Sequence, residues 1–309
     1  MARKLRFLHL ANSASTNIGN GALILGTEFS INQDMPFKIE WYREPWDDYT
    51  FDKRKFNMNF VNTVNENYDC LLVGGAVAIH GRHYLKNTGM RFDLPLDLWP
   101  KIKKPIVFYG LSHRHWSHQP FHHLDKLKKT LLYIIENKNI LFGVRNDNTK
   151  EWLEQITGIK SNKIISIPDP AIYVPYNKSK IYPEILPDRK NIIIAFNNED
   201  ATYRYGGKAR LIISRFLGNF ISEKLTLAIG RELGQVSKRR LKIVKAIVKA
   251  IERTACNKKL NIILVPHYLD DYQMMAEYVS LIKPELAHQN TISTGLQRIE
   301  NTQDFYGLY

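Results

Sequence analysis

Short apolar segments alternate with amphipathic segments along most of the chain. Runs of large and β-branched apolar residues bounded by Gly, Pro, Asn or Ser are typical of buried strands, and apolar residues spaced by three or four are typical of helices. We expect strands at residues 5–10, 39–41, 68–78, 105–110, 140–144, 163–167, 191–196, 260–265 and 291–293. We expect helices at residues 22–29, 121–137, 235–255 and 272–282, and one that stops at Gly158. This alternation predicts an α/β fold with doubly wound parallel sheets.

The chain of 309 residues is too long for one small core, so two domains are expected. Residues 176–190 are rich in Pro, Lys and Tyr and show no period, which is typical of a linker. We therefore predict an N-terminal Rossmann-like domain at 1–178, a linker at 179–190 and a C-terminal Rossmann-like domain at 191–309. The second domain has few strands for this architecture, and residues 304–309 look like the start of a helix, so we expect it to be truncated.

Composition favours a soluble protein of a reducing compartment. Apolar residues make up 44% of the chain and charged residues 24%, as in globular proteins. The two cysteines, Cys70 and Cys256, are far apart, which argues against a disulfide scaffold and a cysteine zinc site. The basic N-terminus precedes an apolar run too short for a signal peptide, and no window is apolar enough to span a membrane. We expect a cytoplasmic location.

The net charge of +14 is compatible with three kinds of partner: nucleic acid, an anionic membrane surface or acidic substrates. The chain has no zinc finger, ribonucleoprotein motif or interleaved basic and aromatic residues, so we do not expect nucleic acid. The densest basic patch lies on the predicted helix 235–255. That helix is interpreted either as a surface helix docked on the sheet or as a basic face resting on anionic lipid headgroups at the inner side of the membrane.

Arg145 lies between the predicted strand 140–144 and a predicted helix that begins among residues 146–149. In open α/β folds, ligands bind at the carboxyl ends of the strands. An arginine beside a helix start is well placed for an anion, because its forked donors match phosphate or carboxylate and free backbone amides add to them. We predict that Arg145 binds an anion. The alternative is a structural ion pair with Asp147 or Asp169.

Asp169 lies between two prolines, which fix the backbone on either side and aim its carboxylate. We expect Asp169 to orient Arg145.

Paired Gly74 and Gly75 follow a buried strand, where they let the backbone approach a ligand or let a helix pack closely.

The first strand is followed by a polar, glycine-containing loop that leads into a helix. Asn17, Gly19 and Asn20 lie in this loop, which exposes backbone amides at a helix start, as a phosphate-bearing ligand requires. The loop is neither a GxGxxG fingerprint nor a P-loop. The alternative interpretation is a plain strand-to-helix turn.

Histidines supply the acid–base candidates. Residues 112–123 contain five histidines, but their spacing fits no zinc signature, so we expect no metal site. His113 is closest to the strand end, and we expect it to face the edge of the sheet where a ligand binds. His267 follows the predicted strand 260–265 and is our candidate for proton transfer. The alternative for each is a structural histidine.

Four motifs in chain order resemble those of the polysaccharide pyruvyl transferases. They are Asn17-Ile-Gly-Asn-Gly21; the strand from Asp69 to Gly75; Val144-Arg145-Asn146-Asp147 with Trp152-Leu153 and Asp169-Pro170-Ala171; and Val265-Pro266-His267 with Asp270-Asp271. The chain departs from the family pattern at Asn20, which replaces an acidic residue, at Asn146, which interrupts Arg-Asp, and at Ala76, which replaces a third glycine. The family's downstream Arg-x-His segment, which resembles the place of the catalytic acid, would follow Tyr309.

The resemblance implies a GT-B-like pair of domains that transfers pyruvate from phosphoenolpyruvate to sugar hydroxyls as a ketal, with no cofactor. By this resemblance Arg145 holds the anionic donor, and the acceptor is a polysaccharide or lipid-linked glycan. Two alternatives stay open. One is a GT-B glycosyltransferase that uses a nucleotide sugar, because fold does not decide function. The other is a truncated, non-catalytic glycan-binding relative.

Overall fold

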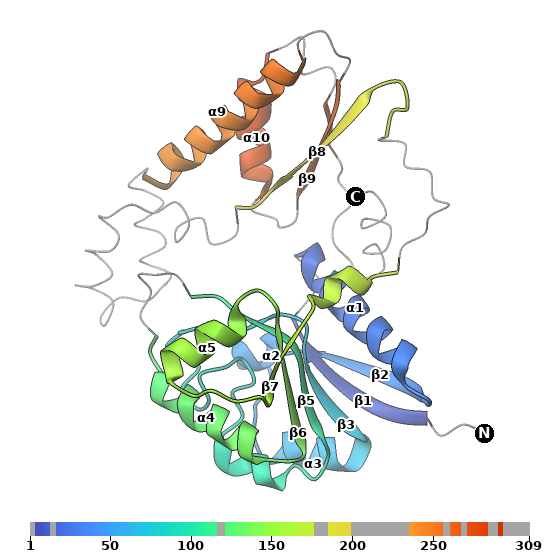
Figure 1. Ribbon diagram of the computed structural model, residues 1–309, viewed down its shortest axis with the longest axis vertical. Coiled ribbons are helices and arrows are strands. Elements are labelled where there is room, and N and C mark those ends of the chain that lie inside the picture. The colour runs from blue at the N-terminus through green and yellow to red at the C-terminus, as the bar shows by residue number, and fades with distance from the viewer. Residues whose placement is uncertain are drawn as a thin grey trace. The chain divides into compact units, whose positions relative to one another are not determined.

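The computed structural model describes residues 4–12, 17–115, 121–175, 185–198, 235–255, 260–266, 271–283 and 290–292. They form a mixed α/β fold with parallel sheets, as the alternating pattern predicts (Figure 1). Backbone contacts divide the chain into two compact units, with a boundary along the sequence between Asn177 and Lys178. The predicted linker and domain bounds stay a prediction.

The first unit is built on a sheet in the order β2-β1-β3-β5-β6-β7, with β4 paired to β5. All of these strand pairs are parallel. The strands are β1 (Lys4–Ala11), β2 (Lys38–Pro45), β3 (Cys70–Gly74), β4 (Val77–Ile79), β5 (Ile106–His113), β6 (Ile140–Arg145) and β7 (Ile164–Ile167). The apolar run at 68–78 is therefore two strands, because Gly75 has a φ of +72° and turns the chain between them.

The connecting helices divide between the two faces of the sheet (Figure 1). The step from β1 to β2 runs in one direction along the sheet, and the steps from β2 to β3, from β5 to β6 and from β6 to β7 run in the other direction. Right-handed crossovers therefore place the helix after β1 on one face and the helices after β2, β5 and β6 on the opposite face. The helices are α1 (Ile18–Asp34), α2 (Asp47–Thr50), α3 (Met58–Asn67), η1 (Leu96–Lys101), α4 (Leu124–Glu136), α5 (Thr149–Thr157) and η2 (Pro170–Tyr173). Helix α5 stops at Gly158, as predicted, in the left-handed conformation.

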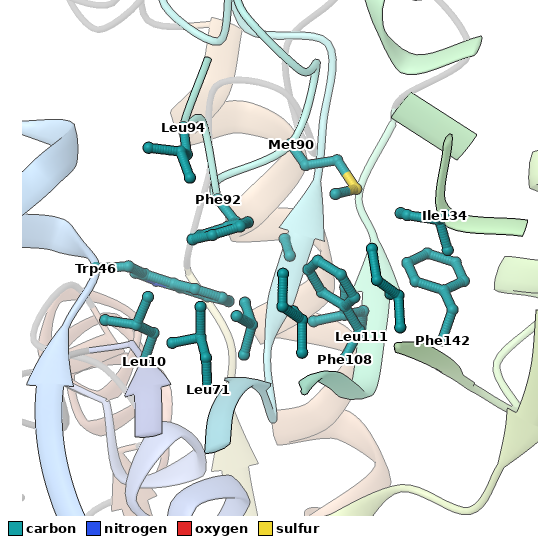
Figure 2. Close-up of a cluster of buried hydrophobic side chains, with 14 of the residues drawn as sticks. Leu10, Trp46, Leu71, Met90, Phe92, Leu94, Phe108, Leu111, Ile134 and Phe142 are labelled. Atoms are coloured by element: carbon teal, nitrogen blue, oxygen red, sulfur yellow. The ribbon is translucent and has the colours of Figure 1, made fainter. Parts of the chain in front are cut away.

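A large aromatic core lies beneath α3, α4 and the segment from β4 to η1. Figure 2 shows Trp46 beside Leu10 and Leu71 at one end and Phe142 beside Ile134 at the other. Trp46 is fully buried although residues 43–67, for which the sequence predicts loops and a short helix, show no clean period. The apolar side chains of this region reach the core from a strand end and short helices, and such irregular connections carry no period.

The second unit has a three-stranded parallel sheet in the order β10-β9-β8. Its strands are β8 (Lys190–Phe196), β9 (Leu260–Pro266) and β10 (Asn290–Ile292), and its helices are α9 (Gln235–Ala255) and α10 (Asp271–Leu281). The fully buried β9 packs with the apolar side of α9 and with α10. No helix among the described residues is both long and apolar enough to cross a membrane.

Candidate active site

The strand order of the first unit reverses between β1 and β3. In doubly wound sheets a crevice forms at such a reversal, outside the carboxyl ends of the strands. The ends of β1, β3, β5 and β6 carry Asn12, Gly74, His113 and Arg145. The topology therefore brings the predicted residues of the first unit to one edge of one sheet.

Asn17 caps the helix α1. Its backbone is extended, and its side-chain oxygen accepts a hydrogen bond from the Gly19 amide at 2.8 Å. The Asn20 side chain accepts one from Asn12, which follows β1, at 3.2 Å. These contacts tie the start of α1 to the end of β1. Asn17 and Asn20 therefore have structural roles at this position, and ligand binding by the loop stays a prediction.

Gly74 and Gly75 allow close packing. A Cβ on Gly74 would lie 3.0 Å from the carbonyl carbon of Tyr109, and a Cβ on Gly75 would lie 3.0 Å from the carbonyl oxygen of Leu23 in α1. The Gly75 amide also donates to the Tyr109 oxygen at 2.8 Å. Of the two roles that the sequence offered, the structure shows close packing of helix and strand. Contact with a ligand stays a prediction.

Arg145 forms an ion pair with Asp169 and not with Asp147. Its Nη1 lies 3.1 Å from Asp169 Oδ2, and its side chain is 14% exposed. Its buried Nε and Nη2 have no hydrogen-bond partner in the part of the chain that the structure describes. Buried donors without an acceptor are costly, by about 1–3 kcal/mol each, and more when the group is charged. The pair with Asp169 thus leaves most of the guanidinium fork without an acceptor.

The Asp-Pro-Ala segment is positioned by two glycines. A Cβ on Gly26 of α1 would lie 2.7 Å from the carbonyl carbon of Pro170, and a Cβ on Gly110 of β5 would lie 2.6 Å from its Cγ. Asp169 caps η2 by accepting a hydrogen bond from the Ala171 amide at 2.9 Å. One oxygen of Asp169 therefore fixes η2 and the other meets Arg145, as the two flanking prolines predicted.

His113 belongs to a hydrogen-bonded chain at the end of β5. Its Nδ1 lies 2.9 Å from Thr149 Oγ1, and Thr149 donates its only hydroxyl proton to Asp147. Thr149 must then accept from His113, so the neutral imidazole carries its proton on Nδ1. Ser112 also donates to Asp147, at 2.5 Å. His113 Nε2 is therefore left with its lone pair, ready to accept a proton.

The ring of His113 is held by stacking. It lies on Trp152 of α5 at a centroid distance of 4.2 Å and an angle of 11°. Burial lowers the pKa of His113 below its usual 6.5; Asp147 opposes this shift and His115 adds to it. The imidazole is therefore mainly neutral at pH 7, which is the state of a proton acceptor.

Sequence reasoning missed a polar network around Arg91. This arginine donates to Asn12 at 2.6 Å, to Asp47 at 3.1 Å and to the ring of His80 at 3.1 Å. It also lies over the ring of Trp46, 5.7 Å from the centroid. These residues come from connections without a period, so only Asn12, directly after an apolar strand, carried a signal in the sequence.

Two predictions bear on residues the structure covers only in part. His267 lies outside the described residues, so its role in proton transfer stays a prediction. Of the five histidines at 112–123, His113, His115, His122 and His123 are described. Among the described residues there is no group of three or more His, Cys, Asp or Glu side chains that could hold a metal ion.

The sequence profile of the polysaccharide pyruvyl transferases matches residues 17–288. The chain belongs to this family. The match spans every described element from α1 to α10 and includes Asn17, Arg145 and Asp169. The family assignment predicted from the four motifs is thereby confirmed. No curated protein matches the chain.

Solved structures resemble the chain at low identity. A Klebsiella pneumoniae protein of uncharacterised function is 14% identical, with a TM-score of 0.34, over 94% of this chain and 93% of that one. The N-terminal domain of Candida albicans trehalose-6-phosphate phosphatase is 11% identical, with a TM-score of 0.47, over 98% and 76%. Methanocaldococcus jannaschii UDP-GlcNAc 2-epimerase is 10% identical, with a TM-score of 0.40, over 96% and 75%.

Proposed function

We propose that this pyruvyl transferase family member transfers pyruvate from phosphoenolpyruvate to two hydroxyls of a glycan as a ketal. The observation that carries the proposal is the guanidinium of Arg145 at the carboxyl edge of the sheet, whose buried Nε and Nη2 have no partner among the described residues. A carboxylate or phosphate of the donor supplies the missing acceptors, and charge-assisted hydrogen bonds of this kind are the strong ones. Asp169 holds the guanidinium in place by its remaining contact.

The reaction requires one acid, one base and neutralisation of two anionic groups. A proton adds to the methylene carbon of phosphoenolpyruvate, which leaves a cationic carbon next to the enol oxygen. One sugar hydroxyl attacks that carbon and loses its proton. A second hydroxyl then attacks the same carbon, phosphate leaves, and the ketal closes. The two protons released by the hydroxyls balance the one taken by the methylene group and the one taken by the phosphate. Arg145 stabilises the anion throughout.

His113 is the base that the described residues offer for the first hydroxyl. Its Nε2 has no hydrogen-bond partner among the described residues, its tautomer is set by Thr149, and its ring is stacked on Trp152. Leu111 pairs with Val144, so the strand ends that carry His113 and Arg145 are neighbours. After it has accepted the hydroxyl proton, the imidazolium is the acid that returns it to phosphate. His267, which follows β9 in the sequence, remains our candidate for protonation of the methylene carbon.

We further propose that the two units form a GT-B-like pair, with domains at 1–178 and 191–309. The donor then binds at the edge of the first sheet, and the acceptor is a polysaccharide or a lipid-linked glycan. We propose a cytoplasmic location, because phosphoenolpyruvate is made and used there.

The exposed side of α9 is the surface proposed to contact an anionic membrane at the inner face. Val244, Val248 and Ile251 bury one side of the helix, and Arg240 is buried against Glu277. The one acidic residue of α9, Glu252, is half-buried, and the exposed basic residues recur at intervals of three or four: Lys238, Lys242, Lys245, Lys249 and Arg253. This spacing places five cations on one side of the helix, opposite to the docked side. Anionic headgroups attract such a basic face.

The test of the proposed function is acceptor-dependent release of phosphate from phosphoenolpyruvate. The purified chain is incubated with phosphoenolpyruvate and a panel of bacterial glycans, and the glycan is examined by NMR for the ketal methyl group. The proposal requires both products in equal amounts. Turnover of a nucleotide sugar with no turnover of phosphoenolpyruvate would instead indicate a glycosyltransferase and reject the proposal.

A further inference from the structure

A cavity of about 470 Å³ lies between the end of β2, the short helix α2 and the first turns of α3. Sites for small ligands have volumes of about 300–1,000 Å³, so this cavity has the size of a binding site. We name it the α3 pocket. Its apolar lining comes from Leu8 of β1 and Phe60 of α3, which are buried, and from the half-buried ring of Tyr49. The rest of the lining is polar and mostly exposed, so the α3 pocket has an apolar base below a polar rim.

One wall of the α3 pocket is held rigidly. The hydroxyl of Tyr49 donates to Glu44 Oε2 at 2.6 Å, and Arg54 Nη1 lies 2.6 Å from Glu44 Oε1. The ring of Tyr49 stacks on Phe56 with 4.1 Å between the centroids and meets Phe60 edge-on. Burial raises the pKa of Tyr49, and the hydrogen bond to Glu44 raises it further, so the phenol stays neutral. A wall fixed in this way loses little conformational freedom when a ligand binds.

The rim of the α3 pocket offers both donors and acceptors. Three of its side chains form no hydrogen bond or ion pair with any described residue: Asp52, Lys55 and Asn59. They supply a carboxylate that accepts, an ammonium that donates and an amide that does both. Each hydroxyl of a sugar also donates and accepts, so one sugar ring can bond to all three side chains.

The charges at the α3 pocket cancel. The lining carries three basic and two acidic side chains, and the carboxylate that pairs with Lys53 at 3.5 Å is the third acidic group. Arg54 is paired at 2.6 Å, and Lys55 is matched by Asp52. A phosphate site has an excess of basic groups, because it must neutralise the anion. The balance at this pocket therefore favours a neutral polar ligand.

The α3 pocket belongs to the same edge of the sheet as the candidate active site. Glu44 pairs with Leu10 near the carboxyl end of β1. Strands β1 and β3 lie between β2 and β5, the strand that carries His113. Neighbouring strands are about 4.8 Å apart, so β2 and β5 are separated by about 14 Å. A chain of several sugar residues spans this distance, whereas a single sugar does not.

We propose that the α3 pocket binds a neutral sugar residue of the acceptor glycan, several residues away from the sugar that receives pyruvate. The apolar base contacts the C–H face of the sugar ring, and the rim bonds to its hydroxyls. The link to an acceptor rests on the proposed function, whereas the binding of a neutral sugar does not.

The first test is saturation-transfer NMR on the full chain with neutral hexoses and N-acetylhexosamines as probes. The parent should bind at least one of them. Asn59→Trp fills the pocket and should abolish the signal. Asn62→Trp makes the same change at an exposed position of α3 outside the pocket and should keep it. No signal in the parent, or equal signals in both variants, would overturn the proposal.

Smaller changes test the rim. Asn59→Ala and Lys55→Ala each remove one proposed hydrogen bond and should weaken the bound sugar by about threefold to tenfold in an NMR titration. Both side chains are exposed, so both variants should fold normally. Unchanged affinity in both would overturn the proposed contacts. Binding of inorganic phosphate that Asn59→Trp abolishes, without binding of any neutral sugar, would show an anion site and also overturn the proposal.

A last comparison separates this proposal from the proposed function. Asn59→Trp should raise the KM for an oligosaccharide acceptor and leave phosphoenolpyruvate binding unchanged, whereas Arg145→Gln should weaken phosphoenolpyruvate and leave the neutral sugar unchanged. If Arg145→Gln leaves phosphoenolpyruvate unchanged, the proposed function fails while the sugar pocket stands. If Asn59→Trp abolishes sugar binding without changing the acceptor KM, the pocket is not an acceptor site and that part of the proposal is wrong.

Discussion

Replacement of Gly26 by alanine tests how the Asp-Pro-Ala segment is held. Gly26 lies within α1, where alanine is normally better than glycine by about 1 kcal/mol. Here the new Cβ would lie 2.7 Å from the carbonyl carbon of Pro170 and closer still to its oxygen. Both partners are backbone atoms of packed elements, so neither yields by a rotamer change. Overpacking of this kind costs about 1–3 kcal/mol.

Because both contacts are with backbone atoms, we take the overpacking cost at the upper end of its range, about 3 kcal/mol. Subtracting the helix gain of about 1 kcal/mol, we expect Gly26→Ala to lower the free energy of unfolding by about 2 kcal/mol. Urea unfolding followed by tryptophan fluorescence is the assay, because all five tryptophans lie at or before Trp152, in the first unit. Gln33→Ala, an exposed change in the same helix, is the control and should be neutral or slightly stabilising.

The same substitution should weaken donor binding. It pushes η2 away from α1, and the capping residue Asp169 moves with it, so the contact between Asp169 and Arg145 lengthens. A Gly26→Ala protein as stable as the parent, or more stable by the full helix propensity, would refute the close packing described here. Unchanged phosphoenolpyruvate affinity in a destabilised protein would refute the link from η2 to Arg145.

Three further predictions follow from named contacts. The pKa of buried His80 is lowered in the folded protein, so the unfolded chain binds more protons below pH 6.5. The free energy of unfolding, measured with urea, should therefore fall as the pH drops from about 6.5 to about 5.5, by up to about 1.4 kcal/mol per pH unit. His80→Gln should flatten this slope, and a stability of the parent that rises over this interval would contradict the burial of His80. Thr149→Val removes the acceptor of His113 Nδ1, so turnover should fall and the acidic limb of the pH–rate profile should shift, whereas an unchanged profile rejects the tautomer argument. Co-sedimentation with phosphatidylglycerol vesicles should fall steeply with salt. It should be lost when Gln replaces Lys242, Lys245 and Lys249, because each lysine contributes about 1 kcal/mol of binding free energy. Replacement of the exposed Lys86, Lys101 and Lys103 is the control and should have no effect; an equal loss in both triple variants would reject α9 as the contact.

The regular part of the fold could be predicted from the sequence. Buried strands such as β3 and β9 are continuous apolar runs, and the helix predicted at 235–255 has the bounds that the structure shows. Periodicity decides such elements because one face of each is buried along its whole length. The bounds of α1 were predicted too short, since polar Asn17 caps a helix whose first turn has no apolar period.

The candidate site was predicted only where it follows a strand end. Arg145 and His113 stand directly at such ends, so topology alone brings them to one edge. The choice between Asp147 and Asp169 as the partner of Arg145 could not be made from sequence. It depends on Gly26 and Gly110, which admit Pro170 and so place Asp169. The network around Arg91 was missed because β4, which accepts a backbone hydrogen bond from Arg91, is three residues long and too short to show a period.

The most direct test of the account is the thermal midpoint of the protein with phosphoenolpyruvate, compared between the parent and Arg145→Gln. At about a hundredfold excess over its dissociation constant, a ligand stabilises the folded protein by about 2.7 kcal/mol. This corresponds to a rise of about 2–4 °C for domains of this size. Lys160→Gln removes an exposed positive charge from the same unit and is the control. The account predicts a rise in the parent and in Lys160→Gln that is absent in Arg145→Gln. An equal rise in all three proteins, or no rise in the parent, would contradict the assignment of Arg145 as the donor-binding residue.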